Sequence, residues 1–182
     1  AGSGLTTATD VTLIGTLAGG DATMTTDAKG TTAVGYKALA VLTSGQMNVA
    51  VGSGSLAKET IGDSNTAVGT TALSSQIGND GSVYNTAVGH NAGRNLTTAK
   101  KTTAIGSDAI GSGITTGDNN TMIGQSAGWS LIGGTSNVGV GVSALEVGTS
   151  ADQNVAIGHQ AAVDITIGRY NTAVGTQALY SD

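Results

Sequence analysis

The sequence contains no cysteine, no proline and no phenylalanine among its 182 residues, and aromatic residues make up only 3% of it. Without cysteine, a disulfide scaffold and every cysteine-ligated zinc or iron–sulfur site are excluded. Collagen is excluded because its triple helix needs proline and a glycine at every third position. The fold must therefore be held together by small side chains and by backbone hydrogen bonds.

Charge is scarce as well. Lys and Arg number 7 and Asp and Glu 12, so the net charge is −5, and charged residues form 10% of the chain against about 25% in a typical domain. So few basic residues cannot form the phosphate-binding surface of a nucleic-acid binder. No apolar run approaches the roughly 18 residues of a membrane span. We therefore expect no nucleic-acid partner and no membrane insertion, while 38% hydrophobic residues argue against disorder.

Glycine is abundant, with 30 residues, and it marks an internal repeat. The pattern Asn-Thr-Ala-Val-Gly occurs in ten approximate copies, and successive repeat glycines are 17 residues apart at six of the nine steps. Short insertions precede Gly35 and Gly89, and one extra residue precedes Gly124. The repeat glycines are Gly15, Gly35, Gly52, Gly69, Gly89, Gly106, Gly124, Gly141, Gly158 and Gly175.

The columns of the repeat predict a short strand in every copy. The residue before the glycine is always Val or Ile, the residue three before it is always Thr or Val, and Ala lies between them in seven copies. Such residues favour a strand, and the glycine ends it. We expect an Ala-Leu pair after the glycine to begin a second short strand, polar residues to turn the chain back, and Val, Ala and Leu to fill the interior.

A unit of this size cannot bury its own apolar residues, so neighbouring units must stack. The sequence predicts an all-β fold, a parallel β-solenoid (β-roll) of about ten 17-residue repeats over residues 11–182, with residues 1–10 as an N-terminal arm or linker. At about 4.8 Å per coil the rod would be roughly 45–50 Å long. The thin interior favours a second buried face, and therefore an oligomer.

The residue four before the glycine is Asn in seven copies, and we expect these side chains to form a structural ladder between coils. The members of this column are Asn48, Asn65, Asn85, Asn120, Asn137, Asn154 and Asn171.

The motifs at residues 154–158 and 171–175 resemble two related families. One is the head repeat of trimeric autotransporter adhesins (YadA-like). The other, closer in period, is the repeat of phage tail fibres, which residues 35–39 and 175–180 also match. The resemblance implies a left-handed β-roll, a trimer and a surface-exposed attachment role, on the virion as a tail fibre or at the cell surface or outside the cell.

Candidate functional side chains are few. His90 and His159 share the column after the glycine, where three copies in a trimer could bind a metal ion; Tyr36 and Val142 in the same column favour a plain surface role. Trp129, Tyr84 and Tyr170 are candidate surface contacts to sugars, or packing residues at coil corners. No carboxylate pair, calcium loop or phosphate loop occurs, so we expect no catalytic residues, no cofactor and no enzyme activity.

The leading interpretation is a structural and attachment protein: a trimeric fibre segment that binds a cell-surface glycan or protein receptor through variable turns such as 16–31 and 70–84. A first alternative is an extracellular filament subunit that polymerises head-to-tail. A second is an ice-binding solenoid, which needs a flat threonine array. Val49, Val138 and Val155 interrupt the threonine column, and we expect that column to face inward or toward partners.

Overall fold

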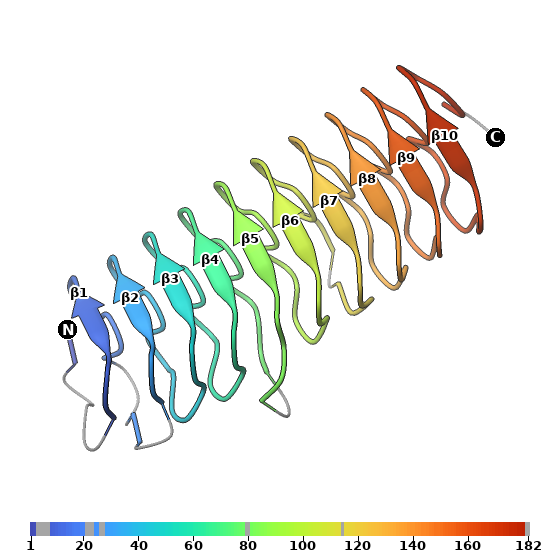
Figure 1. The fold of residues 1–182 in the computed structure, drawn as a ribbon. Coiled ribbons are helices and arrows are strands. Elements are labelled where there is room, and N and C mark those ends of the chain that lie inside the picture. Colours follow the sequence, from blue (N-terminus) through green and yellow to red (C-terminus); the bar gives the residue numbers. More distant parts are fainter. Residues whose placement is uncertain (3–7, 21–23, 26–27, 79–80, 114, 181–182) are drawn as a thin grey trace.

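The chain forms one ten-stranded parallel sheet in which the strands follow one another in sequence order (Figure 1). The computed structural model describes residues 1–2, 8–20, 24–25, 28–78, 81–113 and 115–180. The strands are β1 (Thr12–Ile14), β2 (Thr32–Val34), β3 (Val49–Val51), β4 (Thr66–Val68), β5 (Thr86–Val88), β6 (Thr103–Ile105), β7 (Thr121–Ile123), β8 (Val138–Val140), β9 (Val155–Ile157) and β10 (Thr172–Val174).

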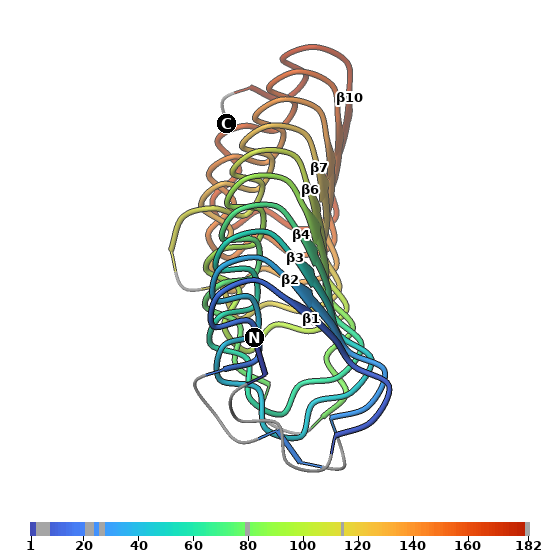
Figure 2. The same cartoon turned by 90° about the vertical axis from the view of Figure 1, so that its left-hand side faces the viewer.

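Each strand belongs to one turn of a solenoid, and we call the turn that contains strand βn coil n. Neighbouring strands pair without any shift of the repeat, as Thr32, Ala33 and Val34 pair with Val49, Ala50 and Val51. Figure 2 shows the coils nearly end-on, with the strands along one side and the return path along the other. The strand side faces the viewer in Figure 1, and the chain runs up it while advancing toward the C-terminus, so the winding is left-handed. The predicted parallel β-solenoid is confirmed.

The repeat glycine is required because successive coils touch at that point. The repeat glycines have φ between +118° and +139°, which L side chains rarely adopt. A Cβ added at Gly89 would lie 2.6 Å from the carbonyl oxygen of Gly106, and one added at Gly106 would lie 2.5 Å from that of Gly124. Glycine is therefore demanded by the approach of the next coil as well as by its own backbone angle.

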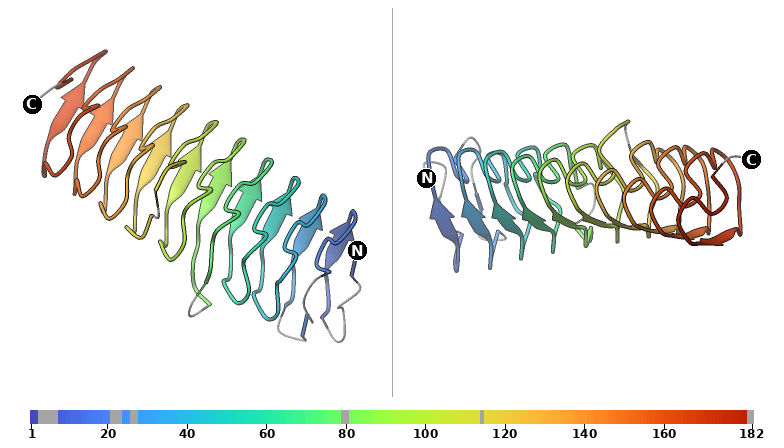
Figure 3. Two further views of the ribbon diagram at one scale, coloured as in Figure 1. Left: turned by 180° about the vertical axis from the view of Figure 1, so that it is seen from behind. Right: turned by 90° about the horizontal axis from the view of Figure 1, so that it is seen from above.

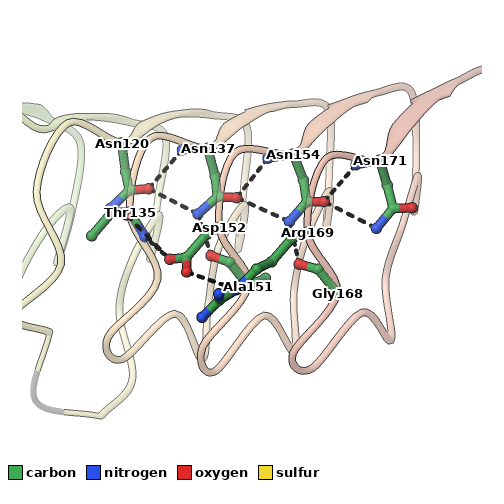
Figure 4. Close-up of polar contacts among 9 residues, drawn as sticks. All are labelled: Asn120, Thr135, Asn137, Ala151, Asp152, Asn154, Gly168, Arg169 and Asn171. Atoms are coloured by element: carbon green, nitrogen blue, oxygen red, sulfur yellow. Dashed lines mark hydrogen bonds and ion pairs between the residues drawn. The ribbon is translucent and has the colours of Figure 1, made fainter.

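The asparagine column forms the expected ladder inside the rod (Figure 4). The backbone N–H of Asn154 donates to Oδ1 of Asn137 at 3.0 Å, and the Nδ2 of Asn154 donates to the same oxygen at 3.2 Å. The Nδ2 of Asn137 also donates to the carbonyl of Ala151 at 2.6 Å, across the coil. Asn137 and Asn154 thus join their coils to the preceding ones and tie the strand side to the return side.

Two expectations about the coil are wrong. The Ala-Leu segment after the glycine forms turns and no strand: Leu39, Leu56 and Leu73 have φ between 48° and 50°, which a strand cannot contain. The Val or Ile before the glycine points outward, because the buried residue of each strand is the central one, usually Ala, and neighbouring residues of a strand face opposite sides. The rod is too narrow for larger side chains at most of these central positions.

The interior is built from the alanine and leucine columns. Ala67, Ala72 and Leu73 of coil 4 are fully buried, and the corresponding residues recur in most other coils. Half of the expected N-terminal arm, residues 3–7, lies outside the described residues; the backbone N–H of Gly2 donates to the carbonyl of Ala18 at 2.9 Å.

Candidate functional site: the outer face of the sheet

The outward side chains of the ten strands form one continuous surface, which we call the strand face. It consists of two columns, the Thr or Val that begins each strand and the Val or Ile that ends it. In the middle of the rod most of the second column is exposed to a similar degree, from 36% at Val68 and Ile105 to 41% at Ile157, and Val140 is less exposed. The residues of the strand face are Thr12, Ile14, Thr32, Val34, Val49, Val51, Thr66, Val68, Thr86, Val88, Thr103, Ile105, Thr121, Ile123, Val138, Val140, Val155, Ile157, Thr172 and Val174.

The strand face carries no charged side chain, because every strand consists only of Thr, Ala, Val, Ile, Leu, Met or Gly. Ten strands about 4.8 Å apart give it a length of about 45 Å. Three residues per strand give it a width of about 10 Å, at about 3.3 Å per residue, so the strand face covers on the order of 450 Å². The residues that flank each strand about double this area. The largest contiguous apolar patch on a monomer is about 300–600 Å² and is often functional, so an uncharged face of this size is a candidate interaction site.

Two margins border the strand face. The leading margin is the second and third residue before each strand, and the trailing margin is the two residues after each repeat glycine. Tyr84 and Tyr170 lie in the leading margin with exposures of 52% and 76% and φ of 60° and 61°. Both tyrosines are therefore available for contacts, as expected. Trp129 is half-buried and packs over Gly111 of the preceding coil. A Cβ added at Gly111 would lie 2.5 Å from the Trp129 ring.

His90 and His159 lie in the trailing margin of coils 5 and 9, and both are exposed. Four coils separate them, about 19 Å along the rod, so one copy of the chain does not bring them together. No group of three or more His, Asp or Glu suited to a metal ion occurs in the described part of the chain, and the same residues form no pocket. Of the variable turns, residues 21–23, 26–27 and 79–80 lie outside the described ranges.

Asp108, in the trailing margin of coil 6, is the one carboxylate of the described residues whose pKa is clearly shifted. Hydrogen bonds from Asn91 and Ser107, at 2.9 Å each, lower its pKa, with Asn91 as the main cause; nearby His90 and Arg94 lower it further. Asp108 therefore stays ionised at and below the pH at which an ordinary aspartate takes up a proton.

Sequence reasoning missed Glu59 on the return side, the one fully buried Asp, Glu, Lys or Arg among the described residues. Its Oε1 accepts hydrogen bonds from the backbone N–H groups of Gly62 at 2.7 Å and of Gly78, in the next coil, at 2.9 Å. The equivalent residues, seven after the repeat glycine, are Leu42, Gln76 and Leu96. A charged residue in a column of core residues is a detectable signal. We assign it a structural role because backbone donors surround the carboxylate.

The fold and the strand face define the chain as a β-solenoid rod with an unusually regular, uncharged outer sheet. No family model, no curated protein and no solved structure matches the sequence or the fold. No helix long and apolar enough to cross a membrane occurs among the described residues.

Proposed function

We propose that the chain is a non-enzymatic structural and attachment protein, a segment of a homotrimeric fibre located on a virion or at a cell surface. The observation that carries the proposal is the strand face, a surface of Thr, Val and Ile that runs without a charge along the whole rod.

Self-association is the simplest way to cover this face. A stable interface buries about 800 Å² on each partner, and the strand face together with the residues that flank each strand offers on the order of 900 Å². Burying its valines and isoleucines is favourable by about 25 cal/mol for each Å² of apolar surface. Around a threefold axis, three such faces give a stiff rod whose length grows with the number of repeats, which suits a fibre.

Attachment would use what the assembled faces leave uncovered. Tyr84 and Tyr170 project from the leading margin, and tyrosine combines an apolar ring with a polar tip. These are the properties of side chains that stack on sugars. The proposed receptor is therefore a cell-surface glycan, or a protein carrying one, bound along the margins and variable turns.

The solution mass tests the proposal directly, by light scattering on a sizing column. We expect a species of about 53 kDa, three times the chain mass of 17.6 kDa. Ile157→Glu places a charge in the strand face and should give a monomer. Ile132→Glu is the matched control, because Ile132 is 42% exposed against 41% for Ile157 but lies outside the face. A parent chain that stays monomeric contradicts the trimer, and a polymer at the void volume supports the head-to-tail filament instead.

The same surface supports a second candidate function, binding to ice. The threonine column faces outward rather than inward, one of the two orientations that we expected for it being toward partners, and it lies on a regular parallel sheet with seven threonines in ten coils. Three valines still interrupt the array. Because a face covered by other subunits cannot touch ice, this function requires a monomer. Thermal hysteresis in the monomeric parent, lost on Thr103→Glu, would establish it; a trimer without hysteresis dismisses it.

A further inference from the structure

Coil 6 carries opposite charges on the two margins of the strand face. Lys101 lies in the leading margin, two residues before β6, and Asp108 lies in the trailing margin, three residues after it. Lys101 is exposed, its φ is 54°, and its backbone N–H donates to the carbonyl of Val83 at 2.9 Å. The ion pair found between described residues joins Arg169 to Asp152, so within the described part of its own chain the Lys101 ammonium has no carboxylate partner.

The symmetry of a fibre decides what these charges meet. Rotation about an axis parallel to the rod keeps every coil at its own height, so coil 6 of one copy lies beside coil 6 of the next. In such a cyclic contact the leading margin of one copy lies against the trailing margin of its neighbour. If the copies ran antiparallel or were displaced along the rod, coil 6 would face another coil.

We propose that an ion pair between Lys101 of one copy and Asp108 of the next sets a parallel, unshifted register when strand faces associate. The inference rests on the self-association proposed above and adds the residues that select its geometry. The strand face cannot select a register by itself, because its side chains repeat almost identically every coil. A shift by one coil would bury nearly the same apolar area, so the choice falls to the margins.

Coil 2 supplies an internal contrast. It is the one other coil with formal charges in both margins, and there the signs are equal, Lys29 and Lys37. The Lys37 ammonium lies 5.6 Å from the centre of the Tyr36 ring. In the proposed register Lys29 and Lys37 of adjacent copies repel each other, so the same geometry predicts opposite effects for the same substitution in coils 2 and 6.

Three substitutions of a lysine by glutamate, which all change the net charge equally, test the proposed register between associated copies. Lys101→Glu should weaken association up to about fivefold at each contact, the upper range for an exposed ion pair. Lys37→Glu should strengthen it by a similar factor. Lys58→Glu is the control, because Lys58 is exposed but lies in neither margin. Dissociation constants from sedimentation equilibrium at low salt supply the measurement, and the differences should shrink in 1 M salt.

The double variant Lys101→Glu/Asp108→Lys should restore association, since it recreates the pair with its signs exchanged. Native-like circular dichroism of Asp108→Lys alone excludes a folding defect, because this variant loses the hydrogen bonds from Asn91 and Ser107. If the parent associates but Lys101→Glu and Lys58→Glu behave alike, the register inference is overturned and the fibre proposal stands. A monomeric parent overturns both.

Discussion

The strand side and the return side of the rod differ in how strictly they restrict the identity of their residues. On the strand side every coil has nearly the same residues, because the backbones of adjacent coils meet there and the asparagine ladder allows few substitutes. On the return side the insertions before Gly35, Gly89 and Gly124 vary the path, and one column holds Leu42, Glu59, Gln76 and Leu96 in successive coils. Contact between backbones therefore restricts residue identity, whereas contact between side chains restricts only volume and hydrogen bonding.

The return side shows how an unlike residue is accommodated. Glu59 replaces a leucine because the N–H groups of Gly62 and Gly78 donate to its carboxylate. Gln76 can also take the place of a leucine, because its Oε1 accepts a hydrogen bond from the Nδ2 of Asn85 at 2.7 Å. A buried polar group that has its partners costs little, while one without them costs several kcal/mol. The four substitutions below test this contrast between the sides, from the largest expected effect to the smallest.

The largest effect should come from Gly89→Ala on the strand side. The new Cβ would lie 2.6 Å from the carbonyl oxygen of Gly106, at a φ of +135°, so coils 5 and 6 would have to separate. We expect a loss of about 5 kcal/mol or more, beyond the usual range for one substitution. Gly133→Ala on the return side has nothing within 4 Å of its Cβ and should be nearly neutral. Urea unfolding followed by circular dichroism compares them, and equal losses would refute the role given to coil contact.

Asn137→Ala should come next, because it leaves buried groups without partners. Oδ1 of Asn137 accepts from the N–H and Nδ2 of Asn154, and its Nδ2 donates to the carbonyl of Ala151. The Nδ2 of Asn154 keeps its bond to the carbonyl of Gly168, so two groups, the N–H of Asn154 and the carbonyl of Ala151, lose their partner, and at about 1–3 kcal/mol each the predicted loss is about 2–6 kcal/mol. Asn171→Ala is the matched control, since Asn171 donates its Nδ2 to Asn154 but accepts no bond in the described structure. Its loss should be about 1 kcal/mol, and a loss equal to that of Asn137→Ala would argue against a cooperative ladder.

Coil 7 breaks the strand-side rule, and a third prediction tests the reason. Met122 takes the place of the usual central Ala and is fully buried. Two residues that contact it are glycines, which leave room for its side chain. A Cβ added at Gly128 would lie 2.8 Å from Met122 Cγ, and one added at Gly139 would lie 2.6 Å from Met122 Sδ. Met122→Ala should cost about 2–3 kcal/mol by opening a cavity, and Gly139→Ala about 1–2 kcal/mol by overpacking. The double variant should cost clearly less than the sum of the two; strict additivity in thermal unfolding would contradict the compensation.

These cases show what the sequence could and could not predict. The period located every strand correctly, because the repeat glycines and the β-branched residues before them are local signals. The expected burial of alanine and leucine was right, and that of the strand valines was wrong: apolar β-branched residues are usually buried, whereas here the narrow section of the rod admits Ala67 and excludes Val68. For the same reason the sequence did not decide between the inward and the outward side for the threonine column. The sequence did not reveal that the small Gly139 makes room for the large Met122, because this compensation depends on a contact between coils and not on the residues of one column.

The smallest effect should be a gain, at the point where the strand-side ladder is weakest. Thr102 occupies the asparagine column in coil 6, and the N–H of Asn120 reaches its Oγ1 only at 3.5 Å, against 3.0 Å from Asn137 to Oδ1 of Asn120. Thr102→Asn would supply the longer side chain and the second donor that the other rungs have. The expected gain is about 0.5–1 kcal/mol, or about 2–4 °C in Tm. Thr98→Asn, at an exposed return-side position, should leave Tm unchanged. If Thr102→Asn also leaves Tm unchanged or lowers it, the extra residue between Gly106 and Gly124 has shifted this rung, and the rule for the strand side would then require the 17-residue spacing as well as the asparagine.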